Sequence, residues 1–149
     1  MELALTLAAQ ATQGGEPPFA ALTVDPNGDV VARATDEVVG KADMTRHAEV
    51  TVVRLACQAV GPDLTGCTLY TTVEPCPMCF TSAWLAKVSR IVFGCTMDAV
   101  HAATGGQQRE LRIPARIVNV QSAEPLDLRG GVLAEACLEL FQEQRANAQ

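Results

Sequence analysis

The sequence predicts an α/β fold, a three-layer α-β-α sandwich in which helices cover both faces of a mixed five-stranded sheet. Two observations lead to this prediction. Near the N-terminus, two β-branched segments flank Asp25-Pro26-Asn27-Gly28, turn chemistry that is typical of an antiparallel hairpin. Further along, residues 67–94 have the strand–helix–strand spacing of a crossover between parallel strands. One sheet must therefore hold both kinds of strand pair.

The first half of the chain predicts a helix, the hairpin, a second helix and a central strand. An Ala/Leu-rich stretch has strong helix propensity and stops at Gly14-Gly15. Residues 35–46 are polar and are expected to form a loop. Thr45 is the predicted N-cap of the second helix. The elements are expected at 3–13 (helix), 19–24 and 29–34 (hairpin strands), 47–60 (helix) and 67–73 (central strand).

The second half predicts two more helices and two more strands. Pro77 is well placed at a helix start, because its fixed φ suits the first helical turn. The elements are expected at 78–87 (helix), 90–94 (strand), 115–120 (fifth strand) and 132–145 (helix), with 95–110 irregular. Residues 1–149 are the right length for a single domain.

Composition and charge narrow the class of protein. With 48% hydrophobic and 19% charged residues, the chain is expected to be globular, and its apolar runs are too short to cross a membrane. The net charge is −6 and the 11 Lys and Arg residues are scattered, whereas nucleic-acid binders usually carry a basic face. A small-molecule partner is therefore favoured over nucleic acid. Six cysteines without a recognisable secretory signal favour a reducing compartment, and a cytoplasmic location is expected.

One set of residues predicts a metal centre. Cys76 and Cys79 have the Cys-x-x-Cys spacing that lets two thiolates bind one ion, and His47 can supply a third ligand. Three protein ligands and one open position are typical of catalytic zinc. Glu49 lies two residues after His47 and is suited to move a proton to or from a water in the open position. We therefore predict Zn²⁺ as cofactor and Glu49 as the catalytic acid/base.

Two other interpretations of the cysteine pair are possible. A closed structural zinc site would need a fourth ligand, for which Cys67, Cys95 and His101 are available, but it leaves Glu49 unexplained. A redox pair would not use a distant His-x-Glu. Catalytic zinc is favoured, and the remaining cysteines are expected to be small core residues.

Four stretches together resemble the cytidine-deaminase-fold superfamily. Within it they are most similar to the branch of bacterial guanine deaminases, cytosine deaminases and tRNA-adenosine deaminases. The stretches are Pro-Phe-Ala-Ala at 18–21, Asp-Met-Thr-Arg-His-Ala-Glu at 43–49, Leu-Tyr-Thr-Thr-Val-Glu-Pro-Cys-Pro-Met-Cys at 69–79, and Arg-Ile-Val-Phe-Gly at 90–94. The similarity is good over about residues 1–98 and returns weakly at 131–137.

The resemblance implies a cytidine-deaminase-like fold and a hydrolytic deaminase of a free nucleobase, nucleoside or related amino-heterocycle. Zinc would activate a water, and Glu49 would carry its proton to the ring and then to the departing amine, so that ammonia is released. Such enzymes are commonly dimers or larger, with neighbouring subunits completing the site, so a homodimer is expected. The implied substrate-binding residues are Phe19, Asp36, Ala48, Glu74 and Pro75, with Phe19 also open to a plain core role.

The chain departs from the family pattern at two positions. Asp36 replaces the usual Asn, and an ionised Asp only accepts hydrogen bonds. A donor-rich edge, such as that of guanine or an aminotriazine, suits it better than adenosine does, unless Asp36 is merely a solvated loop residue. Met44 replaces the usual Pro, so that loop is expected to differ in shape.

Three functions follow from the resemblance and stay open at this point. A guanine-like free substrate is favoured. A tRNA-adenosine deaminase is the alternative with a nearly identical motif, against which the acidic charge balance argues. A catalytically silent scaffold that uses zinc for folding is the third, and the intact pair of His47 and Glu49 argues against it.

Overall fold

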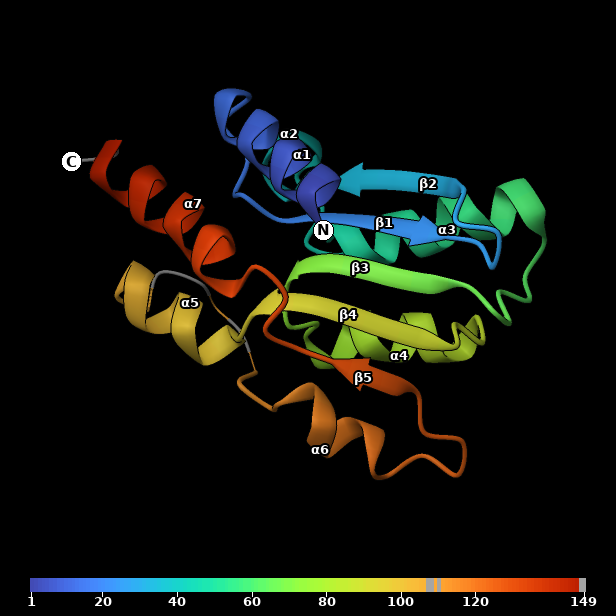
Figure 1. Ribbon diagram of the computed structural model, residues 1–149. Helices are drawn as coiled ribbons and strands as arrows, with labels where there is room; N and C mark the ends of the chain where they lie inside the picture. The colour runs from blue at the N-terminus through green and yellow to red at the C-terminus, as the bar shows by residue number, and fades with distance from the viewer. Residues whose placement is uncertain (107–108, 110, 148–149) are drawn as a thin grey trace.

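The five-stranded sheet has the order β2-β1-β3-β4-β5 in the computed structural model, which describes residues 1–106, 109 and 111–147 (Figure 1). β1 pairs with both β2 and β3 in antiparallel register, whereas β3, β4 and β5 run parallel. The predicted mixed sheet, its hairpin and its parallel crossover are therefore confirmed. The strands are β1 (Ala20–Val24), β2 (Val30–Thr35), β3 (Thr68–Val73), β4 (Arg90–Cys95) and β5 (Asp127–Arg129).

Helices cover both faces of the sheet, as the sequence predicts (Figure 1). One face packs against α3 (Ala48–Val60) and α4 (Pro77–Leu85), beside which lies α6 (Ala115–Asn119). The other packs against α1 (Glu2–Gln13), α5 (Met97–Thr104) and α7 (Ala134–Asn147). The short α2 (Val38–Lys41) lies between β2 and α3. Each face has its own buried apolar cluster, so the sheet separates two cores.

The prediction of a fifth strand at 115–120 is wrong. This segment is the helix α6, and the fifth strand is β5. Pro114 precedes the helix with an extended backbone, and the N–H of Ala115 is bound by the Glu74 carboxylate from 41 residues away. A helix start anchored by so distant a residue overrides the local β propensity. β5 was missed because it has only three residues at the sheet edge.

Two predicted irregular segments also hold short helices. α5 occupies part of 95–110, and the hydroxyl of Thr96 caps it by accepting from the N–H of Ala99. α2 interrupts the loop at 35–46. Thr45 is not the N-cap of the following helix: His47 holds that position, and the Thr45 hydroxyl donates to Asp43.

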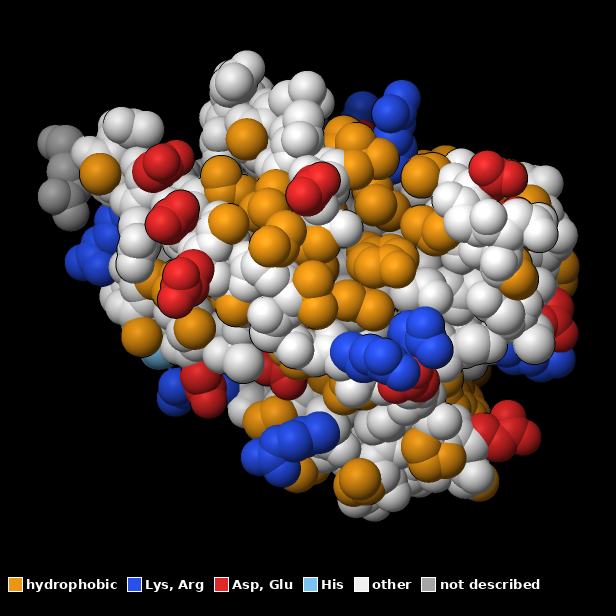
Figure 2. All heavy atoms as spheres, viewed as in Figure 1, with side chains coloured by type: hydrophobic (Ala, Val, Ile, Leu, Met, Phe, Trp, Pro, Cys, Tyr) orange, Lys and Arg blue, Asp and Glu red, His pale blue; other side chains and the backbone are white. Residues whose placement is uncertain are grey.

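On the face seen in Figure 2, basic side chains lie in separate groups with acidic side chains among them. Of the helices in the described part of the chain, none is long and apolar enough to cross a bilayer.

Candidate zinc centre and active-site pocket

The three predicted zinc ligands come together at the starts of two neighbouring helices. His47 directly precedes α3, and Cys76 directly precedes α4, with Cys79 in the first turn of α4. Pro77 holds the first position of α4, as predicted. The two helices pack against each other, so ligands that are 29 and 32 residues apart in the chain meet in space.

The geometry of these three residues fits zinc. Their ligand atoms lie within 4.8 Å of one another. The two sulfurs are 3.5 Å apart, and Nδ1 of His47 is 3.5 Å from Cys79 Sγ and 3.9 Å from Cys76 Sγ. Tetrahedral zinc, with Zn–S near 2.3 Å and Zn–N near 2.0 Å, requires separations of about 3.8 Å and 3.5 Å. The donor set needs only small shifts to bind the ion.

The groups around Cys76 favour the thiolate form of its side chain. The two sulfurs of Cys76 and Cys79 are in hydrogen-bond contact, and this contact, together with the one to His47, lowers the pKa of Cys76 to about 4. The same bond raises the pKa of Cys79, and the bond to Cys76 raises the pKa of His47 to about 9. Zinc binds thiolates and neutral imidazole, so its binding here competes with these protons.

Within the described part of the chain, the metal-ligating cluster consists of these three residues and no others. Neither Cys67 nor His101 belongs to it. Cys95 donates its thiol to the carbonyl of Thr72 instead. A cluster of three protein ligands leaves the open fourth position of a catalytic site.

Glu49 lies beside the cluster in the first turn of α3. Only 4% of its surface is exposed, and its two oxygens accept from the Thr71 hydroxyl at 2.8 Å and from the Cys79 thiol at 3.4 Å. Burial raises the pKa of this carboxyl above its usual value, and the negative charge of Cys76 acts in the same direction. A raised carboxyl pKa suits a group that must both take and return a proton near neutral pH.

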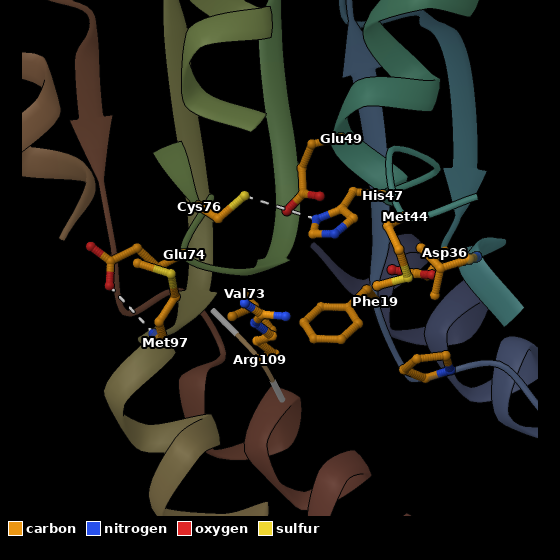
Figure 3. Close-up of a pocket in the computed structure, with 12 residues that line it drawn as sticks. Phe19, Asp36, Met44, His47, Glu49, Val73, Glu74, Cys76, Met97 and Arg109 are labelled. Atoms are coloured by element: carbon orange, nitrogen blue, oxygen red, sulfur yellow. Dashed lines mark hydrogen bonds between the residues drawn. The ribbon is translucent and has the colours of Figure 1, made fainter. Parts of the chain in front are cut away.

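A cavity of about 260 Å³ opens next to the cluster (Figure 3). Ligand pockets more often measure roughly 300–1,000 Å³, so this one is suited to a small ligand. Its lining residues are Pro17, Phe19, Asp36, Val38, Met44, His47, Glu49, Val73, Glu74, Cys76, Met97 and Arg109.

Asp36 is buried in the wall of this cavity, with 4% of its surface exposed. Oδ1 accepts from the N–H of Val38 at 3.0 Å, which fixes the carboxyl at the start of α2. Burial raises the pKa of Asp36. The alternative of a solvated loop residue is therefore wrong.

The other implied substrate-binding residues are placed differently. Phe19 lines the cavity and packs edge-on against Phe141, with ring centroids 5.0 Å apart. Glu74 lines it too, but its carboxylate is turned away from the cluster (Figure 3). Ala48 and Pro75 are buried and are not among the residues that line it.

Several lining residues were not predicted from the sequence. Met97 and Arg109 come from the segment after β4, and Val38 comes from α2. No motif marks them, since the packing of distant segments brings them here. Met44, which stands where the family usually has Pro, also lines the cavity and is exposed.

Comparison with known proteins identifies the family. Residues 1–95 match the model of the cytidine and deoxycytidylate deaminase zinc-binding region. The chain belongs to this family. It contains the zinc-binding region of this family, and His47, Cys76 and Cys79 form a group able to hold the ion.

Relatives include deaminases of two kinds. The chain is 41% identical to the tRNA-specific adenosine deaminase of Bacillus subtilis, over 98% of this chain and 91% of that protein. It is 37% identical to the guanine deaminase of the same species, over 68% and 67%. It also matches the tRNA(Ile)-lysidine synthase of Deinococcus deserti at 41% identity over 68% of this chain, which spans only 19% of the synthase.

Two solved structures are similar to this chain over most of its length. A variant of the protein NE0047 in complex with 8-azaguanine superposes with a TM-score of 0.88 at 27% identity, over 98% of this chain and 82% of that one. A structure from a study of tRNA:A34 deaminases superposes with a TM-score of 0.77 at 31% identity, over 94% and 96%. The cytidine-deaminase-like fold is therefore confirmed.

Proposed function

We propose that the protein is a hydrolytic deaminase of a free, guanine-like amino-heterocycle. The observation that carries this proposal is Asp36, a buried carboxyl that lines the same small cavity as the zinc-ligand cluster. One of its oxygens is bound to the N–H of Val38, and the carboxyl faces a cavity sized for a base. A carboxylate accepts hydrogen bonds and donates none, so it favours a ligand edge rich in N–H groups. The similarity to a structure that holds 8-azaguanine supports the same class.

In this proposal Glu49 is the proton shuttle. Zinc held by His47, Cys76 and Cys79 supplies Lewis-acid chemistry that lowers the pKa of a water toward 7. Glu49 takes a proton from the attacking water and delivers it to a ring nitrogen. It then takes the proton of the new hydroxyl group and delivers it to the amine, so that the carbonyl forms, the C–N bond breaks and ammonia leaves. Because the Thr71 hydroxyl holds one oxygen of Glu49, the other is directed toward the cluster.

The remaining groups orient the base. Ala48 is the first residue of α3, and the first N–H groups of a helix lack partners within it, so its N–H is a donor for the substrate. We assign an accepting role to the backbone carbonyls of Glu74 and Pro75, because Pro75 has no N–H and the N–H of Glu74 already donates to the carbonyl of Cys95. Phe19 lines the cavity and is held by Phe141, which makes its ring a surface for base stacking.

A tRNA-adenosine deaminase is the second candidate. The observation in its favour is the identity of 41% to such an enzyme over nearly the whole of both chains. The net charge of −6 and the dispersed basic groups favour a small substrate instead (Figure 2). A gel-shift assay with tRNA at low salt separates the two, since binding is expected only of the tRNA enzyme.

Ammonia release by the purified, zinc-loaded protein tests the proposal. The panel is guanine, guanosine, cytosine, cytidine, adenine, adenosine and an aminotriazine, with Glu49→Ala as the matched control. We expect guanine or the aminotriazine to react with the wild type only. Reaction of adenosine in a tRNA stem-loop, with no free base turned over, would support the second candidate. Silence on every substrate at full zinc occupancy would support the scaffold.

We also propose that the chain forms a homodimer. Exposed apolar side chains occur at the end of α4 and on and just after α6, and a shallow groove is lined by residues of both helices; such surfaces often mark protein interfaces. The exposed residues are Leu85, Ile117 and Val120, and the groove is lined by Phe80, Trp84 and Val118, among others. Light scattering after size exclusion tests this: wild type should have twice the chain mass. Leu85→Glu should be monomeric, whereas Val60→Glu, which is exposed on α3, should not.

A further inference from the structure

Glu74 lies in the short metal loop, residues 74–76, which connects β3 to α4 and includes the zinc ligand Cys76. Its carboxylate binds the first residues of two helices. Glu74 follows β3 directly and is buried. Oε1 accepts from the N–H of Ala115 at 2.8 Å, and Oε2 accepts from the N–H of Met97 at 3.4 Å. The side chain points toward Met97 and away from the zinc-ligand cluster (Figure 3).

The N–H groups of Met97 and Ala115 need a hydrogen-bond acceptor from outside their own helices. Met97 and Ala115 are the first residues of α5 and α6, and initial N–H groups have no partner inside their own helix. Ala115 is 0% and Met97 3% exposed, so water cannot easily replace the carboxylate. In α5 the Thr96 side chain already caps Ala99, and in α6 Pro114 offers no side-chain cap. An anionic group is also favoured at the positive end of each helix.

The contacts link the wall of the pocket to the metal loop. Met97 lines the cavity, and Cys76 follows Glu74 after a single proline. The backbone N–H of Glu74 donates to the carbonyl of Cys95 at 2.8 Å, so the carboxylate is attached to a fixed point at the ends of β3 and β4. Moving the start of α5 would therefore shift the pocket wall relative to the cluster, and the start of α6 is held by the same carboxylate.

We propose that Glu74 is a positioning residue: its carboxylate holds the starts of α5 and α6 at the metal loop, and so sets the wall that Met97 gives to the pocket. The role concerns substrate fit in the deamination proposed above, on which it rests. It predicts that loss of the carboxylate weakens substrate binding more than it slows the chemical step, because Glu74 does not contact the cluster through its side chain.

The test compares Glu74→Gln with Asp98→Asn. The amide of Gln keeps one acceptor but turns a donor toward the second N–H, so one contact is lost. Asp98 is an exposed acid in the first turn of α5 that accepts from Arg112 at 3.4 Å, which makes Asp98→Asn the matched control. Ala115→Pro is a second variant, since it removes one donor at a helix position that tolerates proline. Amide exchange, zinc content and steady-state kinetics are measured on each zinc-loaded protein.

We expect Glu74→Gln to keep its zinc, to exchange the amide of Met97 or Ala115 about tenfold faster, and to raise KM about tenfold with kcat within about threefold. Ala115→Pro should raise KM in the same way, and Asp98→Asn should resemble wild type. Unchanged exchange and KM, or a kcat that falls in step with zinc content, would overturn the proposal. If wild type deaminates nothing, the proposed function fails, while the exchange data still decide whether Glu74 anchors the two helices.

Discussion

Replacing Thr71 by Val tests the catalytic arrangement without touching a zinc ligand. The Thr71 hydroxyl donates to Glu49 at 2.8 Å, and both side chains are buried. Val has nearly the same shape, so the change removes the bond without opening a large cavity. A hydrogen bond to a charged group contributes about 1.5–3 kcal/mol. At about 1.36 kcal/mol for each tenfold change in rate, kcat/KM should fall about 10- to 150-fold if the bond acts fully in the transition state.

The pH dependence gives a second readout of the same change. The bond to Thr71 lowers the pKa of Glu49, against the raising effect of burial. Without it the pKa of Glu49 rises further, so the carboxylate that accepts the water proton is lost at a higher pH. The acidic limb of kcat/KM should therefore move to higher pH in Thr71→Val.

Thr72→Val is the matched control, because Thr72 is the next residue and is equally buried. Its hydroxyl accepts from the N–H of Ala20 and has no contact with Glu49. Thr72→Val should lower the melting temperature and leave the pH profile in place. If Thr71→Val keeps kcat/KM within about threefold while Glu49→Ala is inactive, the bond does not orient the carboxylate and the reasoning is refuted.

Three further predictions concern the site itself. Glu49→Ala should keep zinc and fold but lose nearly all turnover, and a residual rate above about a tenth of wild type would contradict its role as shuttle. Cys76→Ala should lose zinc, as measured by elemental analysis, because two remaining ligands rarely hold the ion; full occupancy would mean that Cys76 is not a ligand. Asp36→Asn should lower kcat/KM for guanine about tenfold relative to adenosine, since the amide places a donor where the substrate also donates. An unchanged ratio in competition assays would remove Asp36 from substrate recognition.

The zinc-ligand cluster could be predicted from the sequence because each part of it is local. His47 and Glu49 fall within one helical turn, and Cys76 and Cys79 fall within another. The spacing therefore predicts that the two residues of each pair lie close together. Only the packing of the two helices against each other depends on the rest of the fold. The hairpin and the crossover were predictable for the same reason, since each is formed by neighbouring stretches.

What could not be predicted depends on contacts between distant residues. α6 begins at Ala115 because a carboxylate 41 residues earlier binds its first N–H, and the local residues alone favour a strand. Met97 and Arg109 line the pocket only once the segment after β4 has folded back to it. Asp36 was recognisable as a departure from the family, but its burial and its bond to Val38 required the structure.

The short length of β5 affects how one copy of the protein can associate with another. A long, flat edge strand exposes unpaired backbone groups and invites another chain to add to the sheet. β5 has three residues, and Asp127 within it pairs with Arg90 at 2.6 Å and with Arg129 at 3.1 Å. Desolvating this charged triplet would oppose the docking of a foreign strand. This edge of the sheet therefore resists the addition of a strand from another chain, and the charges of the triplet provide the protection.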